Sequence, residues 1–489
     1  MKANSIFKNI IYKFSLEVLR IFIPIISVPY IYRIFKPDIM GQIEFSQSVS
    51  GYFFIFAGFG VYTYGLREIS RVRNDEKKRN KLFTELFLVS TVSSIFVTVI
   101  YLLYVYFKFN SDILLKNMLL INSIHLISYI FYIEWINEAF ENYKFISQKT
   151  IFIKILNLIC IFLFIKVSSD FYKYLFLINI FVFINNFISF IYIRKYIKLD
   201  FKNLKIKKYL FPLGITVLIS NMAILYTQLD KIVLGFYSKN ISEVAYYGVA
   251  QKVMSILMVI IMSIISVTIP RLSFYLGQNQ KSEYENMFNK IFPFIYLLLF
   301  PIGIGIIVLS REISMFFGGI AYLPAQAVIT VFGIRIIVVT IETILTNHVI
   351  FLNKREKIVA IIYGVCGIIN FIMKYLLIKF NYFNAASAIF TTMFAEILII
   401  ILNMYYIKKY LKLELEVFKL KNLKYLLFSL LFFLIGFILR KFGFYYMIYA
   451  IITFILCSGV YFILLIITKD RCIKEILEKI NINKFLRRK

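Results

Sequence analysis

Ionisable side chains lie inside segments that are apolar enough to cross a membrane. In the stretch 211–271, Asp230 and Lys231 are adjacent, and Lys252 follows in the next apolar segment. A charged side chain at the centre of a bilayer costs at least about 2.5–3.5 kcal/mol, so residues of this kind are candidates for function. Ammonium and guanidinium groups hold phosphate oxygens through charge-assisted hydrogen bonds. This stretch is therefore the first candidate for a site that binds an anionic ligand.

Further ionisable residues lie in other long apolar segments. Glu17 and Arg20 share one face of the first segment, and Arg20 is near its middle. Arg335 and Glu342 share one face of a later segment. We expect the cations and nearby amides to bind the ligand, and the acids to act as charge partners or ion-coupling groups. The predicted substrate-binding residues are Arg20, Lys231, Lys252, Arg335, Gln47, Asn221 and Gln228, and the predicted charge-partner or ion-coupling residues are Glu17, Asp230 and Glu342.

A structural role competes with this interpretation. Glu17 with Arg20, and Asp230 with Lys231, are spaced so that each pair could simply hold helices together. Long cationic side chains near segment ends, such as Lys13, can also extend to the membrane interface. Arg20, Lys231, Lys252 and Arg335 belong to spans that are expected at the centre of the protein. These cations outnumber the buried anions there, and this excess favours an anionic ligand.

The composition is that of an integral membrane protein built from helices. Of the 489 residues, 61% are hydrophobic, and the mean hydropathy is +0.80. Soluble proteins are only about 45–50% apolar, and apolar runs of about 20 residues predict spanning helices rather than a barrel. The predicted fold class is an all-α membrane protein with about fourteen transmembrane helices. Their predicted cores are 10–35, 41–66, 82–107, 113–136, 147–166, 171–193, 209–236, 244–268, 287–309, 322–350, 357–378, 383–407, 423–439 and 444–467.

The net charge of +30 has a topological explanation. The Lys and Arg residues gather in alternate connections, and such connections face the cytoplasm by the positive-inside rule. Both termini are then predicted to be cytoplasmic, and binding to nucleic acid is not expected. The basic segments are 67–81, 194–208, 354–357, 408–424 and 469–489.

Several classes of enzyme are disfavoured. The connections on the opposite side are short, with 310–321 the longest, so a polymerase or ligase with a large external catalytic loop is not expected. The chain has no Gly-rich phosphate loop, which disfavours direct nucleotide hydrolysis. Its four cysteines are scattered and it has two histidines, so no metal site is predicted. These features favour a transporter without a cofactor.

A weak internal repeat suggests how the helices are organised. With a shift of 204 residues, 41–47 aligns with 245–251, and Arg67 aligns with Arg271 at an equivalent helix end. An even number of helices per repeat predicts two pseudo-symmetric six-helix bundles with the same orientation and a site between them.

The tail has apolar residues at helical spacing, which predicts a helix on the anionic inner leaflet. These residues are Ile473, Ile476, Leu477 and Ile480. The predicted domains are 1–200 and 201–410 for the two bundles, 411–470 for an additional helix pair, and 471–489 for a basic amphipathic cytoplasmic tail.

Several motifs together resemble a known family. They include Ile25–Arg33 followed by Gly41, Tyr64–Ser70, Tyr226–Gly235 and, further along, Ile269-Pro-Arg-Leu272 and Phe317–Tyr322. Their order and spacing over nearly the whole chain resemble the polysaccharide-transport flippases of the multidrug/oligosaccharidyl-lipid/polysaccharide (MOP) exporter superfamily, including Wzx-type O-antigen flippases.

The resemblance implies a function and a location. Such a protein would move an undecaprenyl-pyrophosphate-linked oligosaccharide from the inner to the outer leaflet of the bacterial cytoplasmic membrane. Its partners would be this lipid-linked oligosaccharide, membrane lipids, and a polysaccharide polymerase and glycosyltransferases. The expected mechanism is alternating access in which Arg20 and Lys252, from opposite bundles, hold one pyrophosphate. A proton or sodium gradient would drive it, and the residues do not decide between the two ions.

Three alternatives stay open, and one is a scaffold for an envelope-synthesis complex that docks partners on its basic cytoplasmic loops. A drug/cation antiporter of the same superfamily should have twelve helices and an acidic cavity, whereas this chain has an extra predicted helix pair and central cations. An envelope polymerase or ligase would need the large external loop that is missing here.

Overall fold

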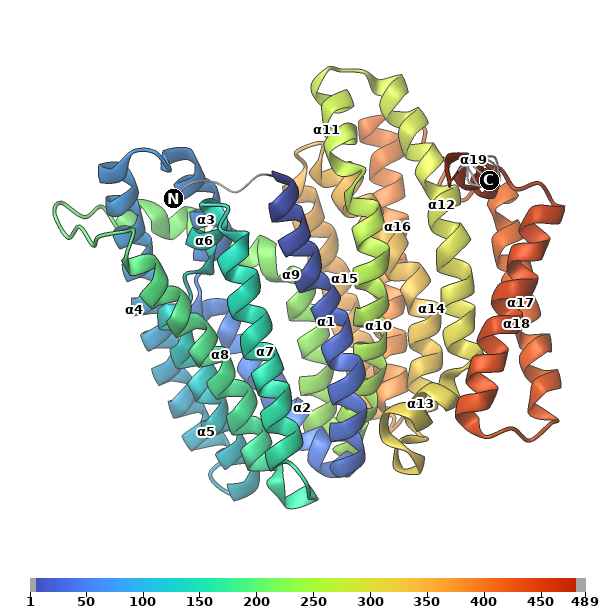
Figure 1. Ribbon diagram of the computed structural model, residues 1–489, viewed down its shortest axis with the longest axis horizontal. Coiled ribbons are helices and arrows are strands. Elements are labelled where there is room, and N and C mark those ends of the chain that lie inside the picture. The colour runs from blue at the N-terminus through green and yellow to red at the C-terminus, as the bar shows by residue number, and fades with distance from the viewer. Residues whose placement is uncertain (1–5, 481–489) are drawn as a thin grey trace, which may run out of the picture. The chain divides into compact units, whose positions relative to one another are not determined.

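The protein is almost entirely helical. The computed structural model describes the backbone of residues 6–480, and the side chains of residues 8–9, 11–217 and 229–475. Within this described backbone there is no strand. The chain divides into two compact units, Met1–Ala245 and Tyr246–Lys489, which run from blue to green and from green to red in Figure 1.

The first unit is a helical bundle around α2. Helix α2 packs on α4, α5 and α9, while α1 packs on α7, and α8 packs on both α5 and α7. Its core includes Phe83, Trp135 and Leu213, all buried. The helices are α1 (Ile6–Ile34), α2 (Pro37–Ala57), α3 (Val61–Val72), α4 (Glu76–Lys108), α5 (Ile113–Ser128), α6 (Glu134–Ala139), α7 (Tyr143–Phe164), α8 (Phe171–Arg194) and α9 (Lys207–Tyr237), with 3₁₀ turns η1 (Tyr129–Phe131) and η2 (Ser168–Asp170).

Two of the spans in the first unit are interrupted. Between α2 and α3 the backbone turns at Phe59 and Gly60, whose φ angles are 43° and 70°. Positive φ is readily adopted by glycine and is rare for other residues, so this is a specific break. Between α5 and α6 the chain passes through η1 and leaves the helical conformation at Tyr132, where ψ is 86°. The two short helices that follow, α3 and α6, pack on each other.

The second unit is organised around α12 and α14. Helix α12 packs on α14 and α17, α14 packs on α16, and α16 packs on α15. The elements are α10 (Ser242–Ser266, which begins at the end of the first unit), α11 (Ile269–Gly277), α12 (Lys281–Val308), α13 (Ser310–Gly318), η3 (Ile320–Tyr322), α14 (Ala325–Ile344), the π-helix η4 (Leu345–Phe351), α15 (Glu356–Lys379), α16 (Ala385–Tyr406), the π-helix η5 (Ile407–Leu411), η6 (Leu420–Asn422), α17 (Leu423–Arg440), α18 (Tyr446–Ile467) and α19 (Arg471–Ile480).

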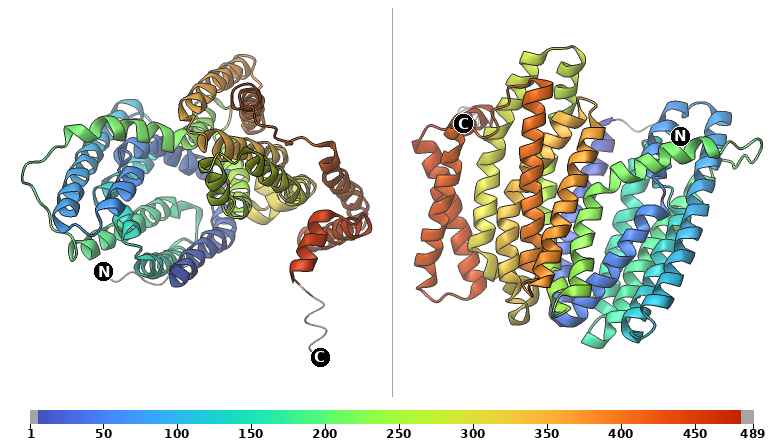
Figure 2. Two further views of the ribbon diagram at one scale, coloured as in Figure 1. Left: turned by 90° about the horizontal axis from the view of Figure 1, so that it is seen from above. Right: turned by 180° about the vertical axis from the view of Figure 1, so that it is seen from behind.

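The last helices form an appendage at the edge of the second unit. Helices α17 and α18 lie side by side as an antiparallel pair, and Figure 2 shows them in red next to α12. The short helix α13 lies at the opposite end of this unit from α11 and α19 (Figure 1). Helix α19 packs on α12 and α18. Its residues Cys472 and Ile473 are buried, whereas the side chains of Ile476, Leu477 and Ile480 lie outside the described residues.

The predicted fold class is confirmed. Thirteen helices among the described residues are long and apolar enough to cross a membrane, and α9, with 31 residues, occupies the position of the predicted seventh span. The protein is thus a multi-pass membrane protein. The described units divide after Ala245, because α9 packs on α2 and α3; the predicted domain boundaries at 200, 410 and 470 stay predictions.

The helices also show the spacing of the predicted repeat. Residues 37–72 and 242–277 each form a 36-residue span in which a long helix is followed by a short one, α2 by α3 and α10 by α11. Arg67 and Arg271 occupy the two short helices. Ser242 donates a hydrogen bond to Asp38, and these two residues are 204 positions apart, the shift inferred from the sequence.

Candidate functional site

Arg20 is an accessible cation in the middle of a membrane-length helix. Its guanidinium donates to Glu17 at 2.9 Å, and the Arg20 and Glu17 side chains are 62% and 36% exposed. Lys154 from α7 is half-buried and lies within electrostatic range of both residues. A charged group this exposed at mid-helix is stable only beside water, so this side of α1 faces a polar region rather than lipid. The guanidinium has donors left over for a ligand, because Arg carries five N–H groups.

Lys231 is buried in an ion pair that joins α9 to α2. Its Nζ lies 2.7 Å from Glu44 Oε2, and the two side chains are 8% and 4% exposed. The other carboxylate oxygen of Glu44 accepts a hydrogen bond from the Tyr32 hydroxyl at 2.8 Å. Asp230 is fully buried and lies within electrostatic range of Tyr52. The structure thus assigns Lys231 a protein partner, Glu44.

The helices around this ion pair approach unusually closely. A Cβ atom added at Gly235 would lie 2.0 Å from the Phe45 ring, and one added at Gly41 would lie 2.2 Å from the Ile241 carbonyl oxygen. Both glycines are therefore required by packing. Phe45 also contacts Phe236 edge-to-face at 5.1 Å. The ends of α2 and α9 near the α9–α10 connection are thus packed without space for a side chain.

In the second unit, Arg335 is neutralised by a carboxylate. Its Nε lies 3.0 Å and 3.1 Å from the two oxygens of Glu396, and its Nη2 lies 2.5 Å from one of them. Arg335 is 4% and Glu396 7% exposed. The bidentate pair connects α14 to α16 and gives the Arg335 guanidinium a partner within the protein. The sequence could not identify Glu396 as the partner, because it is 61 residues away.

Glu342 is a buried carboxyl group surrounded by hydroxyl groups. It is 5% exposed and accepts hydrogen bonds from Tyr363 and from Thr346, the latter at 2.9 Å. Asn403 of α16 donates to the same Thr346 hydroxyl at 3.0 Å. The π-helix η4 begins three residues after Glu342, and π-helical turns are frequent at functional sites.

The other predicted site residues are dispersed. Arg67 pairs with Glu68 at 2.9 Å and is 60% exposed, and Arg271 donates to Tyr275 at 3.1 Å on an exposed surface. Gln47 and Lys252 are half-buried on α2 and α10. The side chains of two further predicted residues, Asn221 and Gln228, lie outside the described residues. No group of three or more potential metal ligands occurs among the side chains that are described.

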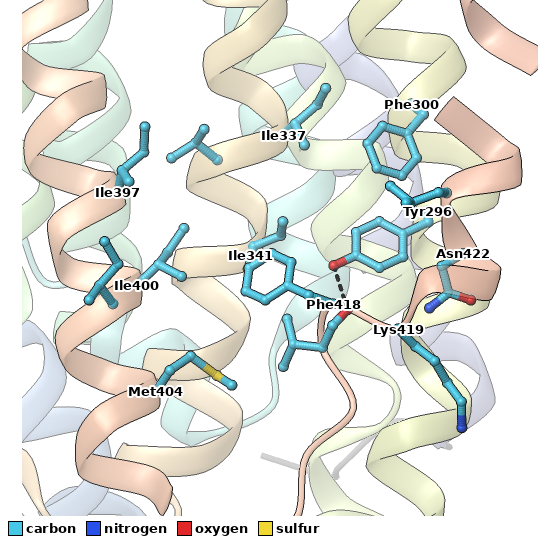
Figure 3. Close-up of a pocket in the computed structure, with 14 residues that line it drawn as sticks. Tyr296, Phe300, Ile337, Ile341, Ile397, Ile400, Met404, Phe418, Lys419 and Asn422 are labelled. Atoms are coloured by element: carbon cyan, nitrogen blue, oxygen red, sulfur yellow. Dashed lines mark hydrogen bonds between the residues drawn. The ribbon is translucent and has the colours of Figure 1, made fainter. Parts of the chain in front are cut away.

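Two apolar grooves open on the surface of the second unit. One has a volume of about 580 Å³ and lies between α12 and the α17–α18 pair, where Pro301, Phe432 and Phe454 are among the lining residues. The other, of about 550 Å³, is lined by α12, α14, α16 and the segment before α17. Figure 3 shows this second groove, with the Tyr296 hydroxyl donating to the Val417 carbonyl at 2.9 Å. Apolar grooves on a membrane protein are suited to lipid chains.

Known proteins with similar sequences and folds are transporters by name. A relative from Shigella dysenteriae, provisionally named O-antigen transporter, is 23% identical over 404 residues, which is 81% of this chain and 98% of the relative. The inward closed conformation of the lipid II flippase MurJ superposes with a TM-score of 0.67 at 17% identity, covering 94% of this chain and all of that one. An inward-facing multidrug MATE transporter of the MOP superfamily gives 0.62 at 13% identity, covering 81% of this chain and 99% of that one. The two structural likenesses establish the fold.

Family membership rests on a match to more than half of the chain. The model of the family described as polysaccharide biosynthesis protein matches residues 6–276, which include the first unit from residue 6 onward and extend through α10 into α11. Together with the MOP-superfamily fold, this confirms the predicted family: the chain belongs to the polysaccharide biosynthesis protein family.

Proposed function

We propose that this protein is a flippase that moves an undecaprenyl-pyrophosphate-linked oligosaccharide from the inner to the outer leaflet of the bacterial cytoplasmic membrane. The observation that carries the proposal is the exposed guanidinium of Arg20 at the middle of α1, in a chain whose relative is named as a transporter of O-antigen. Bilayer-depth cations that lack full neutralisation favour an anionic ligand, and pyrophosphate is such a group.

The three parts of the ligand match three kinds of surface. Arg20 and Lys154 supply cations for the pyrophosphate, and Lys252, which the sequence predicts as a site residue, is a further candidate cation. The polar interior, with Gln47, is available to the sugars. The apolar groove between α12 and α17–α18, of about 580 Å³, is available to part of the lipid tail, which needs no polar contact.

Alternating access requires contacts that hold one side of the protein closed and can be released. The Glu44–Lys231 pair and the glycine contacts of Gly41 and Gly235 join α2 to α9 near the α9–α10 connection, which would lie on the outer side in the proposed topology. We infer that these contacts seal the outer side and separate when the site opens outward.

Glu342 is a candidate for coupling transport to an ion gradient. A buried carboxyl group that accepts hydrogen bonds from Tyr363 and Thr346 can take up a proton without losing its neighbours, because hydroxyl groups both donate and accept. The driving ion is then a proton, with sodium as the other outcome of a gradient test.

The proposed topology has both termini in the cytoplasm. The protein would meet glycosyltransferases on that side and a polymerase on the other side of the membrane.

The direct test is translocation in proteoliposomes that contain an undecaprenyl-pyrophosphate-linked oligosaccharide. Arg20→Ala and Lys252→Ala should each lower the initial rate at least tenfold, while Arg71→Ala, an exposed cation of α3 paired with Glu68, should not. Wild-type rates in both site variants would contradict the cationic site. Transport of organic cations in place of the lipid-linked oligosaccharide would support a drug antiporter instead.

A further inference from the structure

Five aromatic rings form a continuous strip in the first unit. Phe54 of α2 lies 4.0 Å from the His125 ring and 5.9 Å from the Tyr129 ring. Tyr129 contacts Tyr132 at 5.2 Å, and Tyr132 stacks on Tyr62 of α3 at 5.7 Å with an angle of 11° between the planes. These five residues, called the aromatic strip below, are each only partly buried, so each keeps some exposed surface.

The strip lies where two spans are interrupted. Tyr129 and Tyr132 occupy the break between α5 and α6, and Tyr62 follows the break between α2 and α3. A Cβ atom at Gly58 would lie 3.3 Å from the Tyr129 ring, so the first break allows the ring to pack closely. Non-helical backbone at membrane depth is tolerated where it is buried in protein or lines a water-filled cavity, and interrupted helices often mark the binding site of a transporter.

Charged groups lie along the same strip. The Tyr62 hydroxyl donates to Glu138 at 2.6 Å, and Arg20 lies within electrostatic range of Tyr132. Because the Arg20 side chain is 62% exposed, the region that it shares with Tyr132 is polar and accessible. A strip that only filled the bundle core would not have a solvated cation beside it.

We propose that the aromatic strip is a carbohydrate subsite that stacks the rings of a sugar chain whose pyrophosphate is held at Arg20. Sugar rings present apolar C–H faces and peripheral hydroxyl groups. Tyrosine matches both, because it has an apolar ring and a polar tip, and Glu138 accepts hydrogen bonds from sugar hydroxyls. Stacking on aromatic faces is tolerant of sugar identity, which suits a transporter of repeat units. This inference rests on the proposed function and adds the residues that hold the glycan.

The sequence supplies a reporter for the test. Trp135 is the single tryptophan of the chain, is 1% exposed and lies on α6, three residues after Tyr132. Chitotetraose, maltotetraose and sodium pyrophosphate would be titrated into the protein in lipid nanodiscs. Binding would be followed through Trp135 emission and by isothermal titration calorimetry.

The variants separate ring stacking from fold. Tyr132→Ala should weaken tetrasaccharide binding about tenfold and leave pyrophosphate binding unchanged, whereas Tyr132→Phe should bind like wild type because the ring is kept. Tyr192→Ala is the matched control, since Tyr192 stacks on Phe145 at 3.7 Å in the same unit outside the strip. An unchanged Trp135 emission maximum in each variant would show that the surrounding core is intact.

Several results would overturn the inference. The inference is wrong if neither tetrasaccharide binds to wild type in either measurement. It is also wrong if Tyr132→Ala binds with wild-type affinity, or if Tyr192→Ala loses as much affinity as Tyr132→Ala. Translocation then distinguishes the two proposals. If wild type moves an undecaprenyl-pyrophosphate-linked tetrasaccharide and Tyr132→Ala moves it equally fast, only the carbohydrate subsite is wrong. If wild type moves none, the proposed function is wrong as well.

Discussion

Replacement of Lys231 by methionine tests whether the buried ion pair holds α9 to α2. The substitution keeps the length of the side chain and removes its charge, so the Glu44 carboxylate, 3% exposed, loses its ammonium partner and keeps the hydrogen bond from the Tyr32 hydroxyl. Loss of one partner of a buried pair costs about 3–5 kcal/mol, because the remaining charge stays buried without compensation. We expect this loss in the free energy of unfolding.

The double variant Glu44→Gln/Lys231→Met should recover most of the loss. It removes both charges, and the glutamine oxygen still accepts the hydrogen bond from Tyr32. Replacement of a whole buried pair by uncharged groups is often close to neutral. The control is Arg67→Met, which breaks the exposed pair with Glu68 and should cost less than about 1 kcal/mol.

The measurement is reversible unfolding in mixed detergent micelles, with wild type, Glu44→Gln, Lys231→Met and the double variant compared as a double-mutant cycle. A coupling energy of about 2 kcal/mol or more between Glu44 and Lys231 is expected from a buried pair of this kind. The reasoning is refuted if Lys231→Met costs no more than Arg67→Met, or if the double variant is as unstable as the single one.

Two further predictions concern packing and pH. Gly235→Ala should destabilise the protein and slow translocation, because the new Cβ would lie 2.0 Å from the Phe45 ring, whereas Gly305→Ala, which has no neighbour within 4 Å, should be close to neutral in the same thermal unfolding assay. Burial by itself would raise the pKa of the Asp470 carboxyl. The ion pair with Lys424 and hydrogen bonds that include two from backbone N–H groups outweigh burial, so this pKa is lowered. A lowered pKa in the folded state adds stability that is complete above the ordinary value of about 3.9 and is lost as the pH falls through the folded-state pKa. The difference in free energy of unfolding between wild type and Asp470→Asn should therefore be constant at neutral pH and vanish in acid; a difference that persists below the folded-state pKa would contradict the assignment.

Local properties of the chain made the fold predictable. Unbroken apolar length identifies a spanning helix without knowledge of its neighbours, and the thirteen described spans coincide with predicted ones. The 204-residue shift between Arg67 and Arg271 could also be found from the sequence, because a comparison of two segments needs only the order of their residues. The break between α5 and α6 left no comparable signal, since neither Gly nor Pro occurs there.

The partners of the charged residues were not predictable. Glu44 and Lys231 are 187 residues apart, and Arg335 and Glu396 are 61 residues apart. Helical periodicity predicts which residues share a face of one helix. The residue that faces them from a neighbouring helix depends on how far that helix is shifted along its axis and rotated about it.

The sequence by itself therefore determined that the chain is a multi-pass helical membrane protein with cations at bilayer depth, because hydrophobic length and charge position are properties of each segment. Only the tertiary structure decided that Lys231 and Arg335 are neutralised by Glu44 and Glu396 while Arg20 remains 62% exposed. It also brought rings of α2, α3, α5 and the break before α6 into one aromatic strip. Such contacts are set by side-chain packing between helices that are distant in sequence, and packing acts only once the chain is folded.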